Sequence, residues 1–133
     1  MNPSRPERPE MARPEVTDSA VPGATVVDVD VAEAARLAAA GLALLVDVRE
    51  DDEWAAGHAP PAVHVPLGRL PQTPLPRDRP VLAICQSGNR SARAAALLLA
   101  RGVDARNVAG GMQAWQAAGL AVATGDRPPG TAP

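Results

Sequence analysis

The sequence predicts an α/β domain with a five-stranded parallel sheet covered by helices on both faces. Five short segments rich in Val, Leu, Ile and Ala alternate with segments of helical pattern. Strands that alternate with crossover helices pair in parallel, and helices then cover both faces of the sheet. The length of 133 residues is enough for one domain with one core.

Each element has its own local signal. The expected strands are residues 25–29, 42–48, 62–65, 81–84 and 104–108. The second is apolar almost throughout, as in a central strand buried on both faces. The expected helices are one between Asp30 and Gly41 and those over residues 50–56, 91–101 and 111–118. Asp30 and Glu33 have the spacing of a capping box, and Gly41 is the glycine that commonly ends a helix.

The two ends of the chain differ in composition from the part between them. Residues 1–24 and 125–133 are rich in Pro and Gly and have little apolar periodicity. Such segments cannot bury enough apolar surface to offset the entropy of ordering. We therefore expect disordered ends around a folded domain of residues 25–124.

Composition excludes several classes of function. The net charge of -2 favours neither a nucleic acid nor an anionic membrane as partner. A single cysteine cannot form an internal disulfide, and no apolar run approaches the roughly 20 residues that span a bilayer. His58 and His64 have no cluster of further ligands beside them, so neither a metal nor another cofactor is expected. These features predict a cytoplasmic protein.

The only cysteine, Cys85, stands between a predicted strand and a predicted helix. The segment VLAICQSGNRS covers residues 81–91 and places polar or small residues directly after the cysteine. Helix N-termini and nearby cations favour the thiolate, which is the nucleophilic form. A free cysteine is often only a small buried apolar residue. The loop with Gly88 and Asn89 favours a reactive cysteine instead.

A second polar segment follows another predicted strand. Asp47 and Arg49 come at its carboxyl end, and ligands of parallel sheets bind at the carboxyl ends of strands. We expect these two residues to support the cysteine loop and not to act as acid or base. Arg49 would pair with Glu53 at helical spacing, and Asp47 would accept N–H groups of its loop.

Four segments together resemble the single-domain rhodaneses, which are sulfurtransferases of the thiosulfate type. They are LLVDVREDDEWAAGH (44–58), AVHVPL (62–67), CQSGNRS (85–91) and NVAGGMQAWQAAGLAV (107–122). The resemblance covers nearly all of the expected domain and implies the same fold, an α/β domain with five parallel strands. The chain departs from the family at Pro61, where glycine is usual, and at Ser87, where two-domain thiosulfate enzymes have a basic residue.

The resemblance implies a mechanism and a set of site residues. Cys85 would attack the outer sulfur of a donor such as thiosulfate and hold it as a persulfide until an acceptor removes it. The residues that would bind the substrate are Gln86, Ser87, Gly88, Asn89 and Arg90. Ser91, Asp47 and Arg49 would support them. With no second cysteine to resolve the persulfide, the acceptor must be external: cyanide, a small thiol or a partner protein.

Two other functions stay open. A rhodanese-like domain could carry the persulfide to one partner protein without turning over small molecules. Cys-loop phosphatases also place an arginine after a nucleophilic cysteine, but with five residues between them. Four residues separate Cys85 from Arg90. The shorter loop favours a single sulfur atom over a tetrahedral phosphate.

Overall fold

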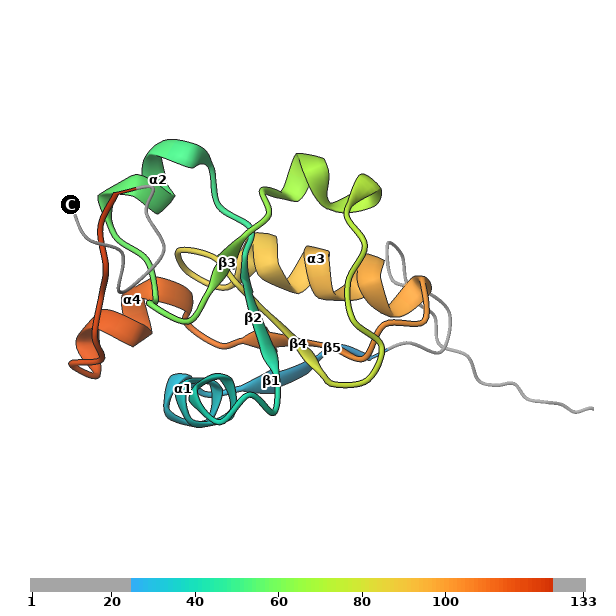
Figure 1. Cartoon of the computed structure of the whole chain (residues 1–133), viewed down its shortest axis with the longest axis horizontal. Coiled ribbons are helices and arrows are strands. Elements are labelled where there is room, and N and C mark those ends of the chain that lie inside the picture. Colours follow the sequence, from blue (N-terminus) through green and yellow to red (C-terminus); the bar gives the residue numbers. More distant parts are fainter. Residues whose placement is uncertain (1–24, 126–133) are drawn as a thin grey trace, which may run out of the picture.

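A five-stranded parallel sheet forms the centre of the protein, in the order β1-β5-β4-β2-β3 (Figure 1). The computed structural model describes residues 25–125. The strands are β1 (Val27–Val29), β2 (Leu44–Asp47), β3 (Val63–His64), β4 (Val81–Ile84) and β5 (Ala105–Val108). Each lies within the segment predicted for it, and the predicted fold class is confirmed.

The helices are α1 (Val31–Ala39), α2 (Asp51–Ala56), α3 (Asn89–Ala100) and α4 (Gly111–Ala117), with a 3-10 helix, η1 (Leu67–Gln72). Helix η1 was not predicted from the sequence, because a short 3-10 helix has no 3.6-residue period and Pro71 lies inside it. Helix α3 begins two residues earlier than expected. Gly88 adopts a φ of 108° as its N-cap, so the chain turns directly into the helix.

The first helix shows half of the expected capping box. The Asp30 carboxylate accepts the backbone N–H of Glu33 at 2.8 Å. The Glu33 carboxylate does not return to Asp30, because it binds the Arg36 guanidinium at 2.7 and 3.0 Å. The prediction of the helix start was right, and that of the reciprocal cap was wrong.

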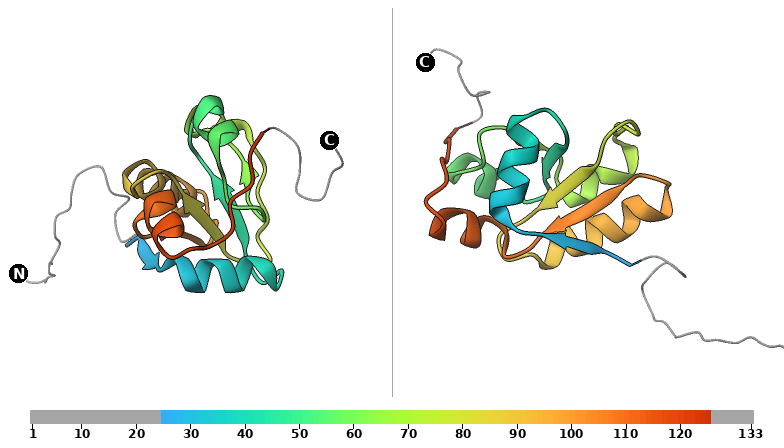
Figure 2. Two further views of the ribbon diagram at one scale, coloured as in Figure 1. Left: turned by 90° about the vertical axis from the view of Figure 1, so that its left-hand side faces the viewer. Right: turned by 90° about the horizontal axis from the view of Figure 1, so that it is seen from below.

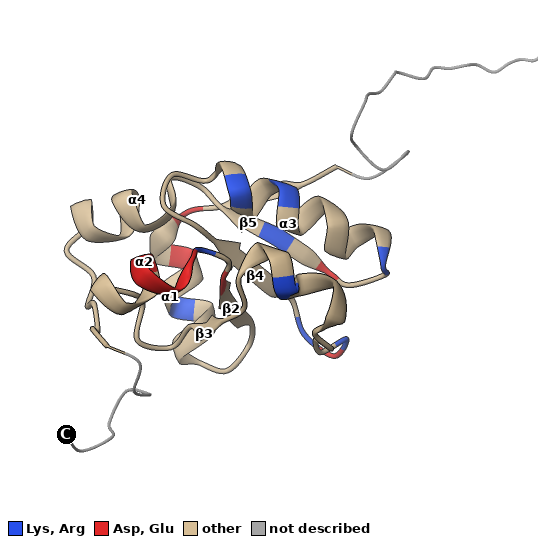
Figure 3. Cartoon of the chain, turned by 90° about the horizontal axis from the view of Figure 1, so that it is seen from above, with Lys and Arg blue, Asp and Glu red and all other residues tan. Residues whose placement is uncertain are grey.

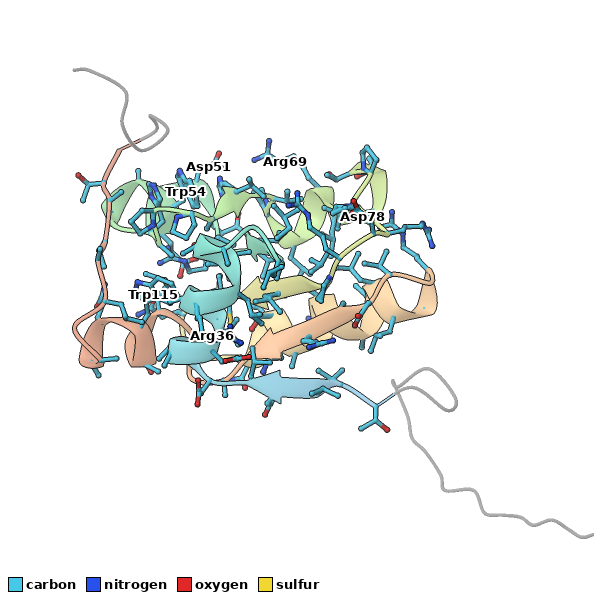
Figure 4. All side chains as sticks on the ribbon, turned by 60° about the horizontal axis from the view of Figure 1, so that its bottom comes forward. Arg36, Asp51, Trp54, Arg69, Asp78 and Trp115 are labelled. Carbon is cyan, nitrogen blue, oxygen red and sulfur yellow. The ribbon has the colours of Figure 1, made fainter. Side chains whose placement is uncertain are left out.

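Helices lie on both faces of the sheet (Figure 2), and an apolar layer fills the space on each face. Alternate residues of each strand point to opposite faces, so Leu45 and Val46 belong to different layers. One layer joins the sheet to α1, α2 and α4 and includes Trp54 and Trp115, which Figure 4 labels. The other layer joins it to α3 and η1 and includes Cys85.

The register of the central strands determines where the polar segments meet. Asp47 of β2 lies beside Ile84 of β4, and the N–H of Val48 donates to the Ile84 carbonyl at 3.0 Å. The segments that follow β2 and β4 therefore emerge at the same edge of the sheet. This confirms the expectation that the residues after Asp47 and the Cys85 loop lie together.

Two further predictions from the sequence concern the ends of the chain and membrane-spanning helices. The segments expected to be disordered, 1–24 and 125–133, lie outside the described residues except for Gly125. Within residues 25–125, no helix has both the length and the apolar character needed to cross a membrane.

Packing of α3 against the sheet predicts that alanine substitutions at two neighbouring leucines differ strongly in their effect on stability. Leu98 is fully buried in the α3 layer, whereas Leu97 is 48% exposed. Replacing Leu98 by alanine should lower the free energy of unfolding by about 2–5 kcal/mol through lost burial and a cavity. Leu97→Ala is the matched control and should cost no more than about 0.5 kcal/mol. Urea denaturation measures both, and equal losses would contradict this packing.

Candidate active site

The Cys85 side chain lies inside the loop that connects β4 to α3. Cys85 is only 1% exposed to solvent. The Sγ atom accepts the backbone N–H of Gly88 at 3.1 Å and lies 3.2 Å from the Ser91 hydroxyl oxygen. The loop therefore encloses the sulfur with hydrogen-bond donors, an arrangement that stabilises an anion.

The backbone carbonyls at the start of this loop point away from the sulfur. The N–H groups of Met112 and Gln113, at the start of α4, donate to the carbonyls of Cys85 and Gln86 at 2.8 and 3.0 Å. Gly111, directly before Met112, has a φ of 55°, and a Cβ there would collide with the Cys85 carbonyl and lie 2.7 Å from the Gln86 backbone. The close approach of α4 thus requires glycine and leaves the N–H groups of the loop directed inward.

Burial and hydrogen bonding act on the thiol in opposite directions. Burial raises the pKa of Cys85, because it disfavours the charged form. The hydroxyl of Ser91 and the N–H groups of Ser91, Gly88 and Ser87 donate to the sulfur, and together they lower the pKa below that of an ordinary cysteine. The site therefore favours the thiolate, the form needed for nucleophilic attack.

The remaining loop residues differ in what they face. Ser87 and Asn89 are exposed to solvent beside the buried thiol. Gln86 is half-buried, and its side-chain oxygen lies 3.3 Å from the Arg49 guanidinium. The structure thus brings together all the residues predicted for the loop, 85–91, and connects them to the segment after β2.

Arg90 is paired within the protein. Its guanidinium makes two hydrogen bonds, of 2.7 and 2.9 Å, with the Glu53 carboxylate of α2. The hydrogen bonds from Arg90 are the largest cause that lowers the pKa of Glu53, to about 2. Arg90 was expected to bind the substrate, but its guanidinium pairs with a carboxylate of the chain itself. Sequence reasoning missed Glu53 as the partner of Arg90.

Arg49 does not pair with Glu53, so this predicted ion pair is wrong. Its guanidinium instead binds Asp47 at 2.8 Å and the carbonyl of Gly57, and both Arg49 and Asp47 are buried. Asp47 also accepts the backbone N–H of Arg49 at 3.0 Å, as expected for a carboxylate that stabilises its loop. Arg49 precedes α2, so helical spacing does not bring it to Glu53.

A polar chain across the sheet reaches Cys85 through Ser91. The Ser91 oxygen lies 2.6 Å from the Asn107 side-chain oxygen, and the Asn107 amide nitrogen donates to Asp28 at 3.0 Å. Sequence reasoning identified Ser91 but missed Asn107 and Asp28. The available signal was the place of Asn107 next to the carboxyl end of a predicted strand, the edge of the sheet where Cys85 was also expected.

The two histidines have structural contacts. His58 stacks on Trp54 at 3.5 Å between ring centroids, and its Nδ1 lies 2.8 Å from the Trp54 carbonyl oxygen. His64 Nε2 lies 2.8 Å from the Arg49 carbonyl oxygen. Across residues 25–125, no group of three His, Cys, Asp or Glu residues is placed to hold a metal ion.

The Arg90–Glu53 pair predicts a defined loss of stability in acid. The pKa of Glu53 falls from 4.5 to about 2 on pairing, so its contribution is present above pH 4.5 and is lost as pH falls from there through about 2. Glu53→Gln should remove this component and flatten the stability profile between about pH 5 and 2. Urea denaturation across this range measures it. Parallel profiles for the two proteins would contradict the pairing.

Comparison with known proteins agrees with the fold. The model of the family described as the rhodanese-like domain matches residues 30–118. A sulfurtransferase of Allochromatium vinosum is 39% identical over 65% of this chain and 84% of its own length. The candidate sulfurtransferase YtwF of Bacillus subtilis is 43% identical over 54% of this chain and 72% of its own length.

A solved structure extends the comparison to three dimensions. The rhodanese-related protein of Thermoplasma volcanium has a TM-score of 0.67 and 29% identity, over 73% of this chain and 97% of that protein. The family match covers more than half of the sequence and includes the Cys85 loop, the polar segment after β2 and strands β2 to β5. The chain therefore belongs to the family of rhodanese-like domains.

Proposed function

We propose that this protein is a rhodanese-type sulfurtransferase that carries the transferred sulfur as a persulfide on Cys85. The observation that supports the proposal most directly is the buried Cys85 sulfur held by the Gly88 N–H and the Ser91 hydroxyl. Donors at this position stabilise the sulfur anion that attacks the sulfur donor. The relatives named as sulfurtransferases support the same class of reaction.

In the first half-reaction the Cys85 thiolate attacks the outer sulfur of a donor such as thiosulfate. A bond forms between Sγ and that sulfur, and the bond to the sulfonate breaks. Its electron pair leaves with sulfite, and the persulfide bears the negative charge. The mechanism uses no general base, because the loop lowers the pKa of Cys85 and the thiolate forms more readily than in an ordinary cysteine.

In the second half-reaction an external nucleophile attacks the outer sulfur of the persulfide. With cyanide the products are thiocyanate and the Cys85 thiolate. The chain has one cysteine, so no internal thiol can release the sulfur. Ser87 and Asn89 are the exposed residues of the loop, and donor and acceptor would approach over them.

Sulfur loading tests this function at one residue. After incubation with thiosulfate and removal of the donor, the intact mass of the protein should rise by one sulfur atom, and cyanide should reverse it. Cys85→Ser should abolish both the mass change and turnover while the protein stays folded. Normal turnover by the serine variant would exclude the mechanism. Loading that only a partner protein discharges would instead indicate a persulfide carrier.

The pairing of Arg90 predicts how the enzyme treats an anionic donor. Thiosulfate must compete with Glu53 for the guanidinium, so Glu53→Gln should lower its KM about twofold to fivefold. Arg90→Ala should raise this KM, because it removes the cation and leaves the Glu53 carboxylate unpaired. Arg93→Ala, an exposed arginine one turn further along α3, is the matched control and should change nothing. KM shifts in the same direction for Glu53→Gln and Arg90→Ala would show that the pair acts on structure alone.

A further inference from the structure

The Ser91 hydroxyl lies between two acceptors and has one proton to donate. Its oxygen is 3.2 Å from Cys85 Sγ and 2.6 Å from the side-chain oxygen of Asn107. Ser91 is fully buried and Asn107 is 6% exposed. Since bulk water does not reach the hydroxyl, the two acceptors compete for the same proton.

Asp28 determines which end of the Asn107 amide faces Ser91. The Asn107 nitrogen donates to the Asp28 carboxylate at 3.0 Å. An ionised carboxylate only accepts hydrogen bonds, so the amide nitrogen must face Asp28 and the amide oxygen must face Ser91. A flipped amide would place its nitrogen on Ser91 and its oxygen against the carboxylate, which is unfavourable.

We propose that Asn107 is a positioning residue that competes with the Cys85 sulfur for the Ser91 hydroxyl proton, and that Asp28 holds Asn107 in this role. In the thiol form, the S–H of Cys85 donates to Ser91, and Ser91 donates to Asn107. In the thiolate form the hydroxyl rotates to the sulfur, and the Asn107 oxygen loses its donor. Asn107 thus opposes the thiolate in the unloaded protein.

The competition ends when sulfur is loaded. Attack on the donor leaves Sγ bonded to two atoms, with the negative charge on the outer sulfur. Sγ then no longer needs the hydroxyl proton, and Ser91 can return to Asn107. The competition of Asn107 with Cys85 for the Ser91 proton therefore affects only the unloaded protein. This inference rests on the proposed function, in which Cys85 carries the sulfur.

Other charged groups lie on the elements packed against the Cys85 loop. They are Arg90 of α3 with its partner Glu53 of α2, the Arg49–Asp47 pair at the end of β2, and Asp28 of β1. The nearby Glu50 also acts on Arg90. A substitution at Asn107 leaves the charge of each of these groups in place and removes only the hydrogen bond to Asp28, so Asn107 gives the cleanest test.

The pH dependence of Cys85 alkylation tests the proposal on the full chain. Iodoacetamide is uncharged, and Cys85 is the only cysteine, so the rate reports the thiolate fraction of this residue. Asn107→Leu keeps the shape of the side chain and removes the competing oxygen. The midpoint of the alkylation rate against pH should fall by about 0.5–1 pH unit. At pH values below the midpoint, alkylation should then be roughly threefold to tenfold faster.

A double-mutant cycle with Ser91→Ala separates this mechanism from a structural effect. Ser91→Ala should raise the midpoint, and Asn107→Leu in that background should then cause no further change. An equal fall in both backgrounds, or an unchanged midpoint in Asn107→Leu, would overturn the proposal.

Asp28→Ala provides a second test if the Asn107→Leu protein does not fold. Asp28 is an exposed residue of β1. Without the carboxylate the amide can turn its nitrogen to Ser91, so the midpoint should again fall. Part of this fall comes from the lost negative charge of Asp28, and the rest comes from the turned amide acting through Ser91. In the Ser91→Ala background only the first part should remain. A fall of the same size in both backgrounds would overturn the proposal. Alkylation needs no sulfur transfer, so these results stand apart from the mass test of the proposed function.

Discussion

A sulfur anion held out of water needs hydrogen-bond donors on the side that solvent would have occupied. Burial alone would raise the pKa of Cys85, and the N–H groups of its loop and the Ser91 hydroxyl reverse that effect. For those N–H groups to point inward, the carbonyls of Cys85 and Gln86 must find donors elsewhere. The start of α4 supplies them. Because this contact requires Gly111, the connection from β5 to α4 is part of the site, although it contributes no side chain to the sulfur.

The two arginines near the loop stabilise its surroundings. Arg49 joins Asp47, the carbonyl of Gly57 and the side chain of Gln86, while Arg90 joins α3 to Glu53 of α2. Figure 3 shows the acidic residues gathered on α2. Backbone dipoles and a hydroxyl, more than an unpaired cation, therefore act on the sulfur. That environment suits the transfer of a single polarisable atom better than the binding of a highly charged oxyanion.

The strands, the position of Cys85 and its meeting with the segment after β2 could be predicted from the sequence. They follow from local apolar pattern and from the rule that parallel strands end at one edge. The partner of Glu53 could not be predicted from spacing. Arg49 is close along the chain but precedes α2, whereas Arg90 is 37 residues away and meets Glu53 only in the folded sheet. The contact between Asp28 and Asn107 spans 79 residues, and only the pairing of β1 with β5 creates it.

In the proposed reaction, the negative charge moves by one sulfur–sulfur bond, about 2.05 Å, when the persulfide forms. Before loading, the charge sits on Sγ, where both Ser91 and Gly88 can donate to it. After loading, the negative charge lies on the outer sulfur, to which the Ser91 hydroxyl no longer donates. The backbone donors of the loop then carry the stabilisation alone. The two half-reactions thus depend on different donors: the side-chain network from Asp28 to Ser91 acts on the thiol, and the loop backbone acts on the persulfide.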